Sequence, residues 1–82
     1  MREKQTYTVM TFHTTAEAIA TEKFCNQQNI PGRLIPVPRE ISAGCGLAWR
    51  MKPVEFAEFE HVIAEFGIGH EAVTEALLKQ AG

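Results

Sequence analysis

Two different periods of apolar residues run along this 82-residue chain, and together they predict five elements and a less certain tail. Residues 6–12 are β-branched and aromatic, which predicts a first strand. Residues 33–37 predict a second strand, which suits a sheet edge because it contains a proline. Residues 46–51 predict a third strand, in which Leu47, Trp49 and Met51 fall on one face.

A first helix is predicted over about residues 15–29, which are rich in Ala, Glu, Lys and Gln. It follows a capping box, in which the Thr14 hydroxyl accepts from the Glu17 amide while the Glu17 carboxylate reaches back. Ile30-Pro31-Gly32 ends the helical pattern. These signals place one helix directly between the first two strands.

A second helix is predicted from Pro53, which suits a first helical turn, to Gly67 at its end. His61 falls on the face that we expect to be solvated. The opposite face carries an apolar stripe at i, i+3, i+7 and i+10, which predicts core positions for Phe56, Phe59, Ile63 and Phe66.

The tail from Ile68 to Gly82 fits two structures. Its composition favours a helix by propensity. However, a sheet of three strands would leave the first strand exposed at an edge, and a fourth strand beginning near His70 would cover it. With that strand the chain forms a two-layer α+β sandwich in the order β-α-β-β-α-β, and a helical tail is the alternative.

Composition narrows the class of protein. An apolar content of 45% with 22% charged residues, in a chain this short, indicates a single soluble domain over residues 1–82. The net charge of -2 argues against a nucleic-acid partner. No apolar run is long enough for a membrane span, and the start does not resemble a signal peptide, so we expect a cytoplasmic protein with reduced cysteines.

The most informative motif places Cys45 between Gly44 and Gly46, six residues after Arg39. Glycines on both sides leave a thiol open to approach and allow unusual backbone conformations. A nearby arginine and the backbone amides of the loop favour thiolate over thiol. The alternative is an ordinary hairpin in which a small cysteine has no chemical role.

Strand direction brings other residues to this motif. In a β-α-β-β-α-β domain the loop after the second strand, the start of the first helix and the end of the second helix share one end of the sheet. We therefore expect His13, Thr14, Arg39 and Cys45 to converge there, with His70 nearby. The amino end of a helix favours an anion, so this end could either lower the pKa of the thiol or hold an anion such as a phosphate or a sulfur or selenium oxyanion.

Other chemistry has weaker support. The histidines and cysteines match no zinc spacing, so no metal site is expected. Cys45 could pair with His13 or His70, although only Glu40 is at hand to orient the histidine. Cys25 lies within the first helix and is expected to be a small buried side chain. Glu22, nearby in the same helix, is either a surface charge or a carboxylate facing the sheet.

The run from Leu34 to Ala48, which contains P-V-P-R-E-I-S-x-x-C-G, closely resembles the signature of the selenium/sulfur carrier-like family. The resemblance spans about residues 6–66 and includes these upstream positions: Phe12, Thr14, Thr15, Ala18, Glu22, Lys23 and Ile30. It implies a bacterial cytoplasmic protein of ferredoxin-like fold. It also implies a role in selenium or sulfur trafficking, with Cys45 as the carrier atom.

Three functions remain open at this stage. In the first, Cys45 holds sulfur or selenium as a persulfide or perselenide without another cofactor. Its partners would be a donor such as a cysteine desulfurase and an acceptor protein, and Arg39 with the Gly44 and Gly46 amides would stabilise the anion. The chain lacks acid/base pairs, which suits a carrier better than a stand-alone enzyme.

The second function is a regulatory module that binds a small anion or a partner without covalent chemistry. The third is a redox protein in which Cys25 resolves an oxidised Cys45. The sequence does not distinguish sulfur from selenium or specify an oligomeric state.

Overall fold

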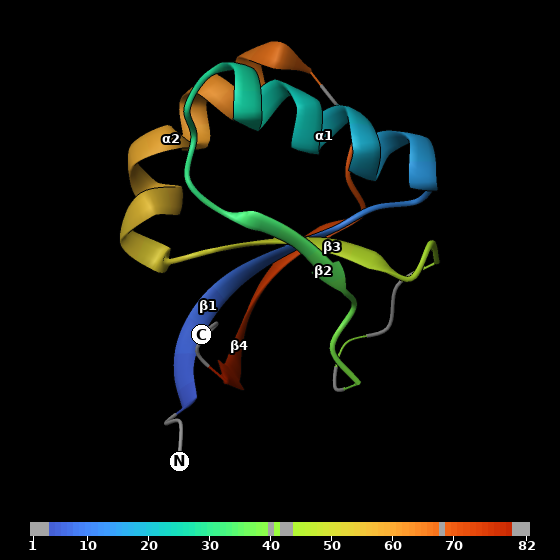
Figure 1. Cartoon of the computed structure of the whole chain (residues 1–82), viewed down its shortest axis with the longest axis vertical. Helices are drawn as coiled ribbons and strands as arrows, with labels where there is room; N and C mark the ends of the chain where they lie inside the picture. The colour runs from blue at the N-terminus through green and yellow to red at the C-terminus, as the bar shows by residue number, and fades with distance from the viewer. Residues whose placement is uncertain (1–3, 40, 42–43, 68, 80–82) are drawn as a thin grey trace.

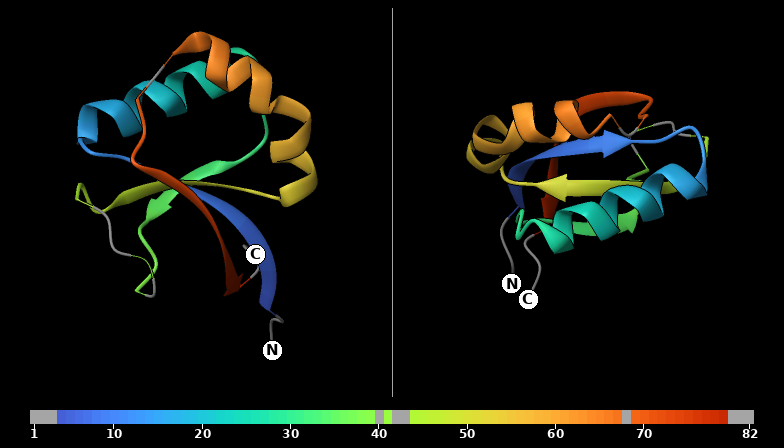
Figure 2. Two further views of the ribbon diagram at one scale, coloured as in Figure 1. Left: turned by 180° about the vertical axis from the view of Figure 1, so that it is seen from behind. Right: turned by 90° about the horizontal axis from the view of Figure 1, so that it is seen from above.

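The computed structural model describes residues 4–39, 41, 44–67 and 69–79. Six elements follow one another along the chain: β1 (Lys4–Thr11), α1 (Thr15–Gln27), β2 (Arg33–Pro36), β3 (Leu47–Met51), α2 (Pro53–Phe66) and β4 (Ala72–Lys79). The strands form one antiparallel sheet in the order β2-β3-β1-β4, and both helices cover the same face of it (Figures 1 and 2). The predicted α+β sandwich of ferredoxin-like order is confirmed.

The tail forms the edge strand β4 and not a helix. It pairs with β1 over its whole length, from Thr11 opposite Ala72 to Lys4 opposite Lys79. The second part of β1, from Tyr7 to Thr11, is buried, so its backbone groups on that side need hydrogen-bond partners. The helix formers of the tail are tolerated because most side chains of β4 remain exposed. Strand pairing therefore overrides intrinsic propensity here.

Both helices are capped close to the predicted positions. The Thr14 hydroxyl accepts the Glu17 N–H at 3.1 Å, which starts α1. α1 ends at Gln27, about two residues before the predicted end. α2 begins at Pro53, and Gly67 caps its carboxyl end.

The main core lies between the helices and the sheet. Its fully buried members include Phe12 and Trp49 from the sheet and Cys25 from α1. Of the predicted apolar stripe on α2, Ile63 is buried and two phenylalanines are partly buried against this core. The prediction that Phe66 belongs to the core is wrong, because this residue is 51% exposed. Its ring instead stacks on Phe24 with centroids 3.9 Å apart, at the rim between the two helices.

A second, smaller apolar cluster covers the face of the sheet that has no helices. Tyr7, Val9 and Ala48 are buried there. Val37 and Ile41, from the connection between β2 and β3, pack against them. Figure 1 shows the described part of this connection below the sheet and both helices above it. The segment that leads to Cys45 is therefore anchored on the reverse face of the sheet.

Candidate functional site

The candidate site lies where β1 ends, β3 and β4 begin, and α1 starts. Thr11 pairs with Ala48 on one side and with Ala72 on the other. The backbone of Gly44 lies beside that of His13, because a Cβ atom built on Gly44 would be 3.5 Å from the His13 carbonyl oxygen. The structure thus brings the Cys45 motif, His13 and the amino end of α1 to one end of the sheet, as the strand directions imply.

The Cys45 side chain is half-buried and packs against the main core from the helix side of the sheet. Its Sγ accepts the Leu47 N–H at 3.4 Å and, as a thiol, donates to the Leu47 carbonyl at 3.5 Å. A deprotonated sulfur keeps the first contact and loses the second. One backbone N–H is therefore placed to stabilise a negative charge on this atom.

The two glycines beside Cys45 have different roles. Gly46 adopts a left-handed φ of 80°, and its carbonyl accepts the Val37 N–H at 2.9 Å, which closes the hairpin. A side chain there would cost about 1–2 kcal/mol by conformation alone. Gly44 is exposed and is not among the residues with positive φ. Gly46 therefore shapes the turn, whereas Gly44 lies exposed beside the His13 carbonyl.

A carboxylate already occupies the amino end of α1. Glu17 accepts the His13 backbone N–H at 2.8 Å, and its Oε1 lies 3.4 Å from the His13 Nδ1. The first of these contacts is the main reason that the pKa of Glu17 is lowered. The Thr14 hydroxyl is engaged with the Glu17 N–H, as described above. The Glu17 carboxylate would therefore compete with an external anion at this helix end, and the binding of such an anion stays a prediction.

Gly69 closes the same end of the molecule. It approaches the Glu17 carboxylate so closely that any Cβ at this position would collide with Oε2. The chain between α2 and β4 is therefore packed against the first turn of α1. This contact lies on the side of α1 that carries the His13–Glu17 pair.

The other predicted site residues are not brought to the sulfur. Arg39 is exposed, and within the described residues it makes no hydrogen bond or ion pair with Cys45. Glu22 is half-buried on α1. Glu40, the proposed orienting carboxylate, lies outside the described residues.

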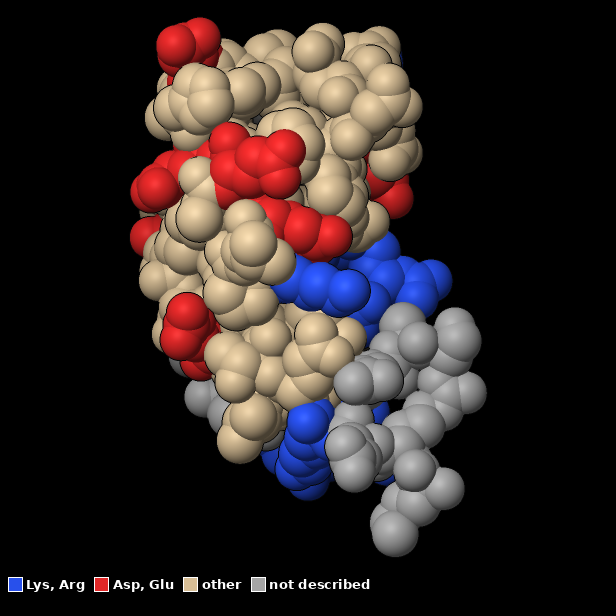
Figure 3. Space-filling model, turned by 90° about the vertical axis from the view of Figure 1, so that its left-hand side faces the viewer, with Lys and Arg blue, Asp and Glu red and all other residues tan. Residues whose placement is uncertain are grey.

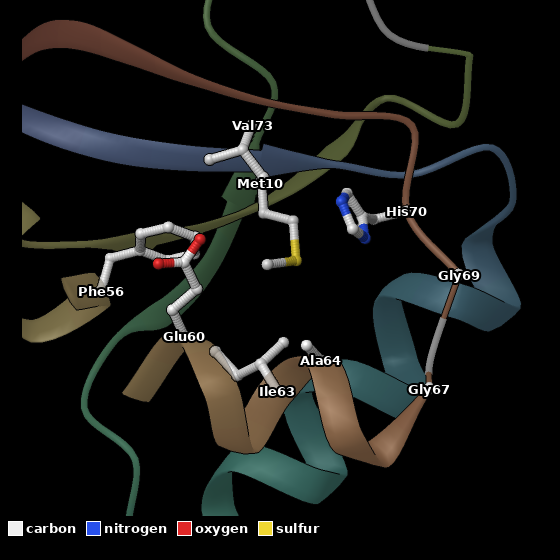
Figure 4. Close-up of a pocket in the computed structure, with 9 residues that line it drawn as sticks. All are labelled: Met10, Phe56, Glu60, Ile63, Ala64, Gly67, Gly69, His70 and Val73. Atoms are coloured by element: carbon white, nitrogen blue, oxygen red, sulfur yellow. The ribbon is translucent and has the colours of Figure 1, made fainter. Parts of the chain in front are cut away.

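His70 belongs to a separate cavity of about 440 Å³ between α2 and the β1–β4 side of the sheet. Figure 4 shows its imidazole and the Met10 side chain pointing into this space, with Phe56 and Glu60 on the α2 side. Cys45 does not line the cavity. The structure therefore gives no support for a Cys45–His70 pair.

Cys25 is completely buried beside Ala18 and Phe24, as the sequence predicts for a packing residue. Desolvation raises the pKa of its thiol from 9.0 to about 11. Ten residues separate it from Thr15, which is about 15 Å along a helix. Cys45 lies beside the opposite end of α1, and a disulfide needs Cα atoms within about 7 Å. The two-thiol redox function is disfavoured by this geometry, and both cysteines are free.

Two groups at the Cys45 end of the sheet are not predicted by the sequence motif. The Leu47 N–H reaches the sulfur because Leu47 is the first residue of β3, a boundary that the pattern locates only to within a residue. The sequence pattern assigns Glu17 to the capping box alone. That box and the predicted topology together place its carboxylate at the end of the sheet that carries the Cys45 loop.

Within residues 4–39, 41, 44–67 and 69–79, no helix is long and apolar enough to cross a membrane. No group of three or more His, Cys or Glu side chains in the same ranges is arranged to hold a metal ion.

Comparison with known proteins gives one result. No curated protein and no solved structure matches the chain significantly. A family model described as "Putative Se/S carrier protein-like" matches residues 7–75, which run from within β1 through α2 into the first part of β4. Cys45 and both flanking glycines lie within the match. The chain belongs to this Se/S carrier protein-like family.

Proposed function

We propose that the protein carries sulfane sulfur or selenium on Cys45 between a donor enzyme and an acceptor protein. The observation that carries this proposal is the setting of the Cys45 sulfur. It is half-buried, faces the Leu47 N–H and lies next to the exposed Gly44. Such a position gives a partner access to the sulfur while the core shields one side of it.

The transfer step is a thiol exchange without net oxidation. The Cys45 thiolate attacks the terminal sulfur of a persulfide on the donor, such as that of a cysteine desulfurase. The bond between the two donor sulfurs breaks, a bond between Cys45 Sγ and the transferred sulfur forms, and the donor cysteine leaves as a thiolate. Release to an acceptor is the same exchange in reverse, and selenium follows the same steps.

The surroundings of Cys45 support a carrier more than an enzyme. Of the two candidate histidines, His70 lines the separate cavity, and the His13 imidazole faces the Glu17 carboxylate. An acid/base group that is paired with another side chain contributes little to reactions at a thiol. Activation of the sulfur would then come from the donor enzyme, and docking would involve the surface around the loop.

The direct test is loading. The protein is incubated with a cysteine desulfurase and cysteine, and its intact mass is measured with and without a thiol reductant. We expect one reducible sulfur per chain, located on Cys45 by fragmentation. Cys25→Ser should load like the parent, whereas Cys45→Ser should not load at all. Equal loading of Cys45→Ser and the parent would refute the proposal.

Arg39 is proposed to favour the charged sulfur through its field, since no direct contact joins the two groups. The time course of alkylation of Cys45 by iodoacetamide is followed at neutral pH. We expect Arg39→Ala to react more slowly than the parent and Arg33→Ala to react at the same rate. Arg33 is a matched control because β2 holds it at the far end of the sheet. Coincident time courses for Arg39→Ala and the parent would remove Arg39 from the site.

A further inference from the structure

A cationic pocket lies at the end of the sheet opposite Cys45, where β3 leads into α2. Its volume is about 350 Å³, and the charged side chains that line it are Arg33, Arg50, Lys52 and Glu55. Figure 3 faces the end of the molecule where α2 begins and shows Lys and Arg side chains gathered beside glutamates. A pocket of this size suits a small ligand.

The two arginines are direct neighbours. Arg33 pairs with Arg50 across β2 and β3. Both side chains therefore project from the same face of the sheet. Like charges directly opposite each other destabilise a sheet. Within the described residues, neither guanidinium has a carboxylate within ion-pair distance. This unfavourable pairing is relieved if an anion lies between the two groups.

Tyr7 holds one of these arginines in place. The Arg50 guanidinium lies over the Tyr7 ring, 4.4 Å from its centroid. Arginine stacked on an aromatic face is restrained before any ligand arrives. Tyr7 also lines the pocket, is only 6% exposed, and its hydroxyl has no hydrogen-bond partner among the described residues. The pocket lining thus includes a tyrosine whose hydroxyl can donate to a ligand.

The charges of the pocket do not balance. Glu55 is its only carboxylate among the described residues, and the Lys52 backbone N–H donates to it at 3.0 Å to cap α2. Three cationic side chains then face one carboxylate, which leaves two positive charges uncompensated. A dianion would neutralise them.

We propose that Arg33, Arg50, Lys52 and the Tyr7 hydroxyl form a binding site for the phosphate group of a small molecule. A phosphate is a dianion near neutral pH, and its oxygens match the paired donors of guanidinium groups. The site is distinct from Cys45 and does not depend on the proposed carrier function. It gives the domain a second ligand at the end of the sheet remote from the sulfur.

The test is a titration of the ¹⁵N-labelled protein with inorganic phosphate and, separately, with adenosine monophosphate, at constant ionic strength. We expect saturable shifts of the Gly32, Arg33 and Lys52 amides. Tighter binding of the nucleotide would identify a phosphorylated small molecule as the ligand, and equal binding would identify free phosphate. The absence of saturable binding for both probes would overturn the proposal.

Variants locate the site. Arg50→Gln and Arg33→Gln should each raise the dissociation constant for phosphate at least tenfold. Arg39→Gln removes the same charge elsewhere and should change this constant less than twofold. Without ligand, Arg33→Gln should melt no lower than the parent, since it relieves the like-charge pair. Equal weakening by Arg39→Gln would indicate general attraction and contradict the site. Cys45→Ser should bind phosphate like the parent, which separates this test from sulfur loading.

Discussion

Cys25 and Cys45 are the same residue in contact with the same apolar core, yet their surroundings differ in one decisive respect. Cys25 lies within α1, where the backbone N–H groups are used by the helix itself. Its sulfur makes no hydrogen bond among the described residues, and burial keeps it protonated. Cys45 lies just before β3, where the Leu47 N–H is free to contact the sulfur. The comparison shows that the environment of each sulfur depends more on the backbone groups beside it than on its contact with the core.

The largest effect expected from this difference concerns sulfur loading. Cys45→Ala should lose loading completely, because it removes the accessible sulfur. Cys25→Ala should retain it, since the buried thiol takes no part. Mass spectrometry after incubation with a cysteine desulfurase and cysteine measures both. Loss of loading in both variants would end the division of roles and restore the two-thiol redox function.

The second prediction concerns alkaline pH. The pKa of Cys25 is about 11 in the folded protein against 9.0 as the ordinary value, so the unfolded chain releases this proton first as pH rises. The unfolded state then binds fewer protons, and the free energy of unfolding falls between pH 9 and 11. The expected loss is about 2 kcal/mol. Urea unfolding at several pH values measures it.

Cys25→Ala is the control for this pH dependence. It should lack that part of the alkaline loss, because all other groups are the same in both proteins. Parallel curves for the parent and the variant would show that the buried thiol does not control alkaline stability.

Smaller effects are expected at neutral pH. Cys25→Ala leaves a small void in the core and should lower the free energy of unfolding by about 1 kcal/mol. Cys45→Ala should cost less, because the side chain is half-buried and lies at the rim of the core. Chemical denaturation of both variants provides the comparison. A larger loss for Cys45→Ala would mean that this residue is kept for packing.

The smallest effect concerns Glu17, which closes the end of α1 near Cys45. Its lowered pKa means that its contribution to stability is present at neutral pH and disappears as pH falls through the folded-state value. Glu17→Gln should therefore have a slightly lower melting temperature than the parent at neutral pH, and the same melting temperature as the parent in acid. Thermal melts at both pH values test this. A difference in melting temperature between parent and variant that persists in acid would show that the effect comes from packing and not from charge.

Much of the fold could be predicted from local signals. Three local signals predict elements close to their observed bounds. They are the capping box at Thr14 for α1, Pro53 for the start of α2, and the alternation around Trp49 for β3. The tail was ambiguous because its helix formers say nothing about the unpaired edge of β1. Phe66 was misplaced because a stripe on a helix does not reveal where the partner surface ends.

The candidate site was only partly accessible to sequence reasoning. Topology placed His13 and Cys45 together, but the position of Glu17 depends on a side-chain rotamer. The Arg33–Arg50 pair requires the exact register of β2 against β3, and a shift of one residue would separate the two charges. Such information lies in tertiary contacts and not in residue spacing.

The position of β1 also has a consequence for how the chain folds. This first strand lies inside the sheet, and its partner β4 is the last element, so Lys4 finds Lys79 across almost the whole sequence. Pairings of such separation close large loops and slow folding. During synthesis one edge of β1 stays open until residues 72–79 have left the ribosome. Aggregation through that edge is therefore the characteristic hazard of this domain before its chain is complete.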